Sequence, residues 1–226
     1  MAERCVKVYS RFNRLWHWSQ VASIFLLLFS GARIMGLHSV LPFGLAVMVH
    51  SFGALALLLL WAFATFWLFT TGAWKQYLPT QAGLWQVMRF YAWGVFRGEP
   101  HPYRKVLWRK HNPLQAMAYL ALKIVLFPGI WITGLIYLTH GFWQTLDKGG
   151  FWIEAVANLH ILAAFAIASF VIVHVYLLTI GGFRAHVRPM VTGFDMIDLT
   201  AEQEAYLQEN EPDRLREPRH AAHPAE

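Results

Sequence analysis

Two histidines in one long apolar segment are the residues of this chain best suited to chemistry. His160 and His174 lie in the stretch "NLHILAAFAIASFVIVHVY", residues 158–176, which contains no charged residue. An ionisable side chain in such a setting is costly, so it marks a functional site. At 3.6 residues per turn and 1.5 Å per residue, their spacing puts both on one helix face, about 21 Å apart. That distance is too long for one metal ion and fits two separate cofactors.

Two further histidines lie in or beside apolar segments, His17 in "RLWHWSQ" and His50 in "MVHSFG". A neutral imidazole is a common metal ligand, and two imidazoles can occupy both axial positions of a haem iron, an arrangement that favours electron transfer. A zinc site would need ligands close to one another. Each histidine taken alone could instead hydrogen-bond to a neighbouring helix. His140 is interpreted as an interfacial residue.

The elements that must position these histidines are membrane helices. Hydrophobic residues make up 57% of the 226 residues and charged residues only 14%, against about 25% in ordinary soluble domains. Isolated strands cannot cross lipid, and a spanning helix needs about 20 apolar residues. The sequence therefore predicts an all-α, integral membrane four-helix bundle. Its apolar segments run over residues 15–35, 45–69, 114–139 and 152–180.

The distribution of lysine and arginine predicts the orientation. Sixteen of these residues lie before the first apolar segment, between the second and third, or after the fourth, and only Lys148 lies in the two other connections. The excess of positive charge marks the cytoplasmic side. Both termini are therefore expected in the cytoplasm, and the net charge of +6 reflects this orientation and no nucleic-acid partner. We expect the basic start and first apolar segment to be a retained helix and no cleaved signal peptide.

This orientation also predicts how the histidines pair. His17 opens the first helix and His174 is near the end of the fourth, so both lie in the cytoplasmic half. His50 and His160 lie early in helices that start at the outer face. Of the three ways to pair four histidines, only His17 with His174 and His50 with His160 matches depth in both pairs.

The remaining segments complete the predicted organisation. Aromatic and basic residues alternate over 74–98, which indicates an interfacial helix between helices two and three. A transmembrane domain is expected over residues 1–194. An acidic polar tail follows over 195–226, with a short helix at 200–210 and then disorder. The lone Cys5 excludes a multi-cysteine metal or iron–sulfur site.

The motifs "RFNRLWHW", "KHNPLQ" and the His-x13-His of the fourth helix resemble a known family. The chain is similar over about residues 10–190 to the membrane-embedded di-haem cytochrome b subunits of respiratory oxidoreductases. These include the gamma subunit of formate dehydrogenase, the b-type cytochrome of nickel–iron hydrogenases and the cytochrome b of thiosulfate reductase. "KHNPLQ" leans toward the last.

The resemblance implies two b haems in a bacterial inner-membrane, multi-pass protein. His17 and His174 would bind the inner haem, and His50 and His160 the outer one, in agreement with the pairing by depth. It also implies a quinone (menaquinone or ubiquinone) near the cytoplasmic face, beside Asn112, Gln115 and His174. The implied partner is a periplasmic-side redox subunit: an iron–sulfur protein, molybdoenzyme, hydrogenase or multihaem cytochrome.

Several residues admit a structural interpretation as well. Asn112 could cap helix three with Pro113 at its first position. Lys123 could extend to the interface or pair with a haem propionate, and Arg33 could pair with an outer propionate. Gly31, Gly53 and Gly134 could admit a porphyrin or simply allow close helix packing.

The sequence thus favours an electron-transfer subunit that links quinone to a redox partner. No motif for a substrate-converting centre lies in the chain, so no catalytic residue is assigned. The alternative is a small haem-free transporter or a proton or metal channel that uses the membrane histidines, although few acidic residues accompany them. A purely structural membrane anchor would leave the matched depths of the histidines unexplained.

Overall fold

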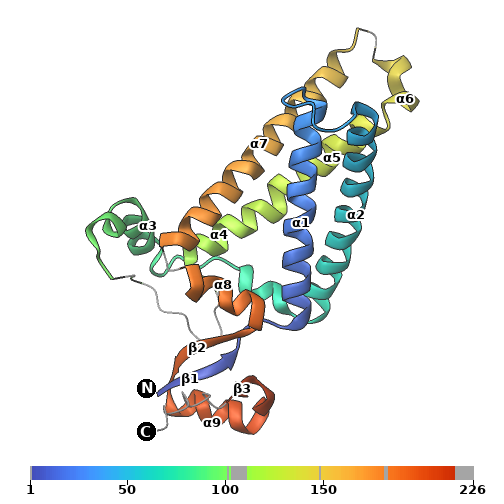
Figure 1. Cartoon of the computed structure of the whole chain (residues 1–226). Coiled ribbons are helices and arrows are strands. Elements are labelled where there is room, and N and C mark those ends of the chain that lie inside the picture. Colours follow the sequence, from blue (N-terminus) through green and yellow to red (C-terminus); the bar gives the residue numbers. More distant parts are fainter. Residues whose placement is uncertain (1, 101, 103–110, 148, 181–182, 217–226) are drawn as a thin grey trace, which may run out of the picture. The chain divides into compact units, whose positions relative to one another are not determined.

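The chain folds into long helices and one small sheet, shown as a computed structural model in Figure 1. The structure describes residues 2–100, 102, 111–147, 149–180 and 183–216. These residues divide into two compact units. The membrane unit comprises residues 16–78 and 117–177, and the terminal unit comprises 1–15, 79–116 and 178–226. Both ends of the chain contribute to the terminal unit, and the expected domain boundary at residue 194 stays a prediction.

Four helices of the described chain are long and apolar enough to span a membrane. They are α1 (Arg11–Ile34), α2 (Phe43–Thr70), the continuous span Pro113–Leu138, and α7 (Phe151–Ile180). The predicted helical bundle class is confirmed. Large apolar side chains such as Leu59 (73% exposed) and Ile172 (69% exposed) point away from the protein, as side chains that face lipid do.

The third span consists of three helical segments. It runs through α4 (Pro113–Ala121), a π-helical turn (Leu122–Leu126) and α5 (Phe127–Leu138). Its start is fixed by Asn112, whose Oδ1 accepts a hydrogen bond from the Gln115 backbone N–H at 2.8 Å. Gln115 Oε1 in turn accepts from the Asn112 N–H at 3.1 Å. This reciprocal capping box confirms the predicted helix-capping role of Asn112.

The fourth span is capped by a residue that the sequence analysis did not single out. Asp147, which is 7% exposed, accepts hydrogen bonds from the backbone N–H groups of Trp152 at 3.1 Å and Ile153 at 3.0 Å. A carboxylate at this position also interacts favourably with the positive end of the helix dipole. Asp147 follows the short helix α6 (His140–Trp143) and a 3-10 turn, Gln144–Leu146.

The connection between the second and third spans is not one long interfacial helix. It contains a 3-10 turn (Ala73–Tyr77), α3 (Leu84–Ala92) and a second 3-10 turn (Gly94–Arg97). Gly72 and Gly83, which precede the first two of these segments, have φ angles of +70° and +78°. These left-handed conformations suit glycine and interrupt the helix. Residues 101 and 103–110 of this basic connection lie outside the described residues.

In the terminal unit, β1 (Ala2–Lys7) lies between two strands from the other end of the chain. It pairs antiparallel with β2 (Phe194–Leu199) and with β3 (Leu215–Arg216), in the order β2-β1-β3. Helix α8 (Phe183–Thr192) precedes β2. The two ends of the chain are therefore paired within one unit, which is compatible with an even number of spans.

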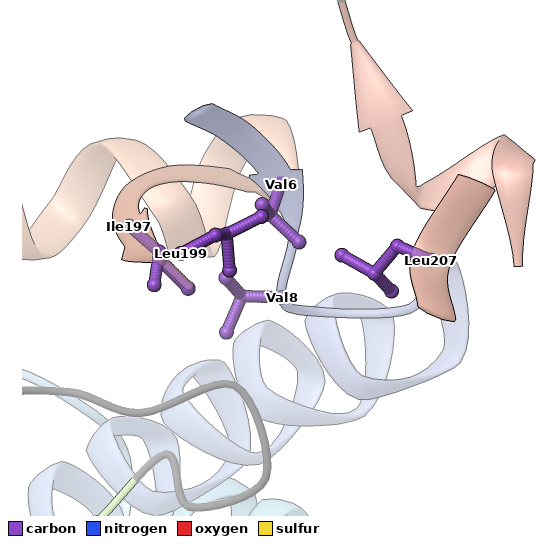
Figure 2. Close-up of a cluster of buried hydrophobic side chains, with 5 residues drawn as sticks. All are labelled: Val6, Val8, Ile197, Leu199 and Leu207. Carbon is purple, nitrogen blue, oxygen red and sulfur yellow. The ribbon is translucent and has the colours of Figure 1, made fainter. Parts of the chain in front are cut away.

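The segment expected to be a polar tail is folded as far as residue 216. Helix α9 (Ala201–Asn210) confirms the predicted helix and begins with a capping box between Thr200 and Gln203. Its Leu207 is fully buried, and Arg4 of β1 pairs with Glu204 at 2.8 Å. The predicted disorder is therefore wrong up to residue 216, because apolar side chains of both termini form a small core, shown in Figure 2: Val6, Val8, Ile197, Leu199 and Leu207. Residues 217–226 lie outside the described residues.

Candidate functional site

The outer pair of histidines meets inside the membrane unit. The ring centroids of His50 on α2 and His160 on α7 are 6.2 Å apart, and the ring planes make an angle of 74°. Two imidazoles that share one metal ion, with nitrogen–metal distances of ~2 Å, have centroids about 6 Å apart. The observed separation therefore fits two axial ligands on opposite sides of one iron.

Each outer histidine contacts a hydroxyl group on the preceding span. Ser30 Oγ of α1 lies 3.1 Å from His50 Nδ1, and Thr133 Oγ1 of α5 lies 3.0 Å from His160 Nδ1. Ser30 is completely buried. The sequence analysis missed both residues, because nothing in a serine or threonine of one helix shows which ring of another helix it contacts.

Two of the three glycines proposed to admit a porphyrin lie directly against these rings. A Cβ atom at Gly31 would be 3.2 Å from His50 Cε1, and one at Gly134 would be 3.1 Å from His160 Cε1. At Gly53 a Cβ atom would be 3.4 Å from Leu27 Cδ2, which is ordinary helix packing. Gly31 and Gly134 thus make room for the imidazoles, and Gly53 allows α1 and α2 to pack.

The inner histidines lie within electrostatic range of each other, His17 on α1 and His174 on α7. The ring of Phe170 stacks on His174 with a centroid distance of 5.9 Å and an interplanar angle of 12°. His17 Nδ1 is buried and has no hydrogen-bond partner among the described residues. A buried polar atom without a hydrogen-bond partner is rare. Binding of a cofactor through one ring nitrogen would explain why this imidazole is buried here.

An apolar layer separates the two histidine pairs along α7. Ile167, at the midpoint between His160 and His174, is 5% exposed and packs with Leu122 and Phe127. Trp61 and Trp131 pack edge-to-face in the same cluster, with ring centroids 4.4 Å apart. The structure thus keeps two distinct polar positions in the bundle, as the helix rise predicts.

Lys123 is positioned by aromatic rings. Its Nζ lies 4.5 Å from the centroid of Trp16 and 4.7 Å from that of Tyr77, in the π-helical turn. Burial, together with Tyr119, raises the pKa of Tyr77 to about 12, so Tyr77 is neutral at physiological pH. The contacts of Lys123 are cation–π interactions, and its extension to the interface or pairing with a haem propionate stays a prediction.

Two other residues considered in the sequence analysis have local structural roles. Arg33 donates a hydrogen bond from Nε to the Leu41 carbonyl at 2.7 Å and lies over the Phe43 ring. It ties the end of α1 to the start of α2. His140 packs edge-to-face on Trp143, 4.6 Å between ring centroids, which is consistent with an interfacial residue.

Most polar groups of Asn112 and Gln115 already form hydrogen bonds within the protein. Besides the capping box, the Asn112 side-chain N–H donates to Tyr91 Oη at 3.4 Å, and Asn112 is 3% exposed. Burial raises the pKa of Tyr91, and the hydrogen bond from Asn112 opposes this shift. Quinone contact by Asn112 and Gln115 stays a prediction, as do the ligand roles of the four histidines.

A multi-ligand metal site is not seen in the part of the chain that the structure describes. No three His, Cys, Asp or Glu side chains gather there at one point. Two histidines from different helices, His50 on α2 and His160 on α7, instead approach each other as a pair. This arrangement suits a ligand with two axial positions better than a tetrahedral ion.

Comparison with known proteins agrees with this class of membrane protein. Residues 8–193 match the family described as prokaryotic cytochrome b561. YdhU of Escherichia coli (strain K12), by name a candidate cytochrome, is 30% identical over 185 residues, which cover 78% of this chain and 69% of YdhU. No solved structure matches the chain.

The chain belongs to the prokaryotic cytochrome b561 family, since the match covers most of its length. It is a multi-pass protein of the bacterial inner membrane that binds b-type haem and transfers electrons.

Proposed function

We propose that the chain is the di-haem membrane subunit of a respiratory oxidoreductase, and that it links the quinone pool to a redox partner at the periplasmic face. One observation carries the proposal: the rings of His50 and His160, two membrane histidines from different helices, approach each other. The outer pair has the centroid separation of 6.2 Å that one shared iron would require.

The residues suit the cofactor in both places. His50 and His160 would hold the outer haem, with Gly31 and Gly134 making room for their rings. His17 and His174 would hold the inner haem, and the unpaired Nδ1 of His17 belongs to a ring with no other described polar role. When bound, a haem with two histidine ligands supplies one-electron transfer without an open position for oxygen. The outer rings contact the hydroxyl groups of Ser30 and Thr133, and Phe170 stacks on the ring of His174.

The quinone and the partner are inferred from chemistry and from the resemblance. A membrane carrier without a substrate-converting motif needs a lipid-soluble electron source or acceptor and a second protein. The quinone is expected near the cytoplasmic face, beside the inner pair. The thiosulfate-reductase, formate-dehydrogenase and hydrogenase types of complex all fit this arrangement.

A haem-free transporter or channel is the competing function. It would need a polar path that joins the two histidine pairs across the bilayer. The apolar layer of Leu122, Phe127 and Ile167 lies in that interval and favours electron transfer, which needs no continuous path for ions.

Purified full-length chain in lipid nanodiscs tests the proposal. We expect about two b haems per chain in a pyridine haemochrome assay, and their reduction by a soluble quinol such as menadiol. A folded, helical preparation without stoichiometric haem would favour the transporter. Two haems that dithionite reduces and menadiol does not would keep the di-haem assignment and remove the quinone link.

A further inference from the structure

The two outer histidines are held by matching five-residue motifs. The first is Leu27–Gly31, "LLFSG", on α1, and the second is Ile130–Gly134, "IWITG", on α5. Each has an aliphatic residue, a hydroxyl residue three positions later, and then glycine. Each contacts the histidine of the next span, His50 for the first motif and His160 for the second.

The contacts made by the two motifs correspond position by position. The backbone carbonyl of the aliphatic residue lies beside the hydroxyl group: Leu27 O is 3.3 Å from Ser30 Oγ, and Ile130 O is 3.1 Å from Thr133 Oγ1. The hydroxyl oxygen lies 3.1 Å from Nδ1 in the first motif and 3.0 Å in the second. The glycine lies under the ring, where a Cβ atom would come within 3.2 Å and 3.1 Å of Cε1.

These contacts determine which ring nitrogen carries the proton. Ser30 donates its single hydroxyl proton to the Leu26 carbonyl at 2.8 Å, and Thr133 donates its proton to the Gly129 carbonyl at 2.7 Å. With its proton on that carbonyl, each hydroxyl oxygen can only accept from Nδ1. In this arrangement Nδ1 of both histidines is the N–H donor. In a neutral imidazole this leaves the lone pair on Nε2.

We propose that Ser30 and Thr133 are positioning residues that hold His50 and His160 in the Nδ1–H form, so that both present Nε2 to one haem iron. The inference rests on the proposed di-haem function. The group that a ring nitrogen hydrogen-bonds decides which nitrogen binds the metal. A hydrogen bond from the other N–H also fixes the ring orientation and raises the basicity of the ligand.

At least one histidine of the inner pair lacks a hydrogen bond between its Nδ1 and a hydroxyl group. His17 Nδ1 has no hydrogen-bond partner among the described residues. The two haems should therefore respond differently to loss of a hydroxyl group. Removing Ser30 or Thr133 changes the outer haem and leaves the inner one as it is.

The test uses full-length protein with Ser30→Ala and Thr133→Val. Thr133→Ser keeps the hydroxyl and serves as the rescue variant. Two matched controls have the same hydroxyl-to-carbonyl bond and no described histidine contact: Ser23, which donates to Ser19 at 2.9 Å, and Thr139, which donates to Leu135 at 2.8 Å. Their variants are Ser23→Ala and Thr139→Val.

We measure transfer of haem to apomyoglobin and the midpoint potentials by optical redox titration. Loss of such a supporting hydrogen bond lowers metal affinity roughly 10- to 100-fold, so the outer haem should leave faster in Ser30→Ala and Thr133→Val. Its potential should rise, because a less basic ligand stabilises the oxidised iron less. Thr133→Ser should behave like the wild type.

The outcomes separate this inference from the function on which it rests. A wild-type chain with fewer than two haems would count against the di-haem proposal and against this inference together. A wild-type chain with two haems, whose Thr133→Val and Ser30→Ala variants match Thr139→Val and Ser23→Ala in both readouts, would overturn this inference alone.

Discussion

Replacement of Gly134 by alanine tests how closely the bundle is fitted to the outer histidine. The new Cβ atom would lie 3.1 Å from His160 Cε1 and 3.5 Å from its Nδ1. The first distance is shorter than the ~3.5–4.0 Å at which two carbon atoms attract each other best. The imidazole must therefore move by a few tenths of an ångström, away from its contact with Thr133 and from the position that the proposed iron would require.

The expected free-energy cost of Gly134→Ala comes from two opposing effects. Overpacking a closely fitted site costs about 1–3 kcal/mol, and alanine gains about 1 kcal/mol over glycine within a helix. The net cost is roughly 0–2 kcal/mol, which corresponds at its upper end to a roughly thirtyfold loss. We expect this loss in the affinity for the outer haem, because only His160 is displaced.

Gly129→Ala is the matched control on the same helix. A Cβ atom at Gly129 would meet no described atom within 4 Å, so this variant should bind haem as the wild type does. The assay is the haem content per chain after a fixed exposure to apomyoglobin. If Gly134→Ala retains the outer haem as firmly as Gly129→Ala does, the close fit of Gly134 to His160 is not functional.

Three further predictions concern stability. Asn112→Ala removes half of a capping box and should lower the free energy of unfolding by about 1 kcal/mol. Circular dichroism should show this as a lower thermal midpoint. Alanine at the exposed Met117, the control, should cost less. Burial and Tyr119 raise the pKa of Tyr77 from 10.0 to about 12. Because the unfolded chain loses this proton at lower pH than the folded chain does, the free energy of unfolding should fall as pH rises from 10 to 12. Tyr77→Phe should flatten that part of the stability–pH curve. Leu207→Ala removes a fully buried side chain and should cost about 2–5 kcal/mol, seen as faster proteolysis of the C-terminal segment than in alanine variants at the exposed Met196.

The spans could be predicted because length and apolar composition decide them locally. The third span was expected over 114–139 and runs over Pro113–Leu138. The first begins at Arg11, about one turn before the expected residue 15, since the polar residues at its start are helical without being apolar. Matched depth predicted the approach of His50 and His160, because spans constrain position along the membrane normal.

Contacts between distant segments could not be predicted in this way. The pairing of Ala2–Lys7 with Phe194–Leu199 joins residues from opposite ends of the chain, and neither segment carries a strong strand pattern. The roles of Ser30 and Thr133 depend on which side chain of a neighbouring helix faces them. A one-residue rotation of either helix would remove those contacts while leaving composition and hydropathy unchanged.

The pairing of the four histidines is the central claim, and haem content in single-histidine variants tests it most directly. His50→Ala and His160→Ala should each lose the same haem and keep the other, and His17→Ala and His174→Ala should lose the other one. His38→Ala is the control, since His38 is half-buried, stacks on Phe29 and is bonded to the Phe29 carbonyl, and it should keep both. The account predicts two classes of variant with distinct remaining spectra. Loss of the same haem from His50→Ala and His174→Ala, with the other retained, would contradict it.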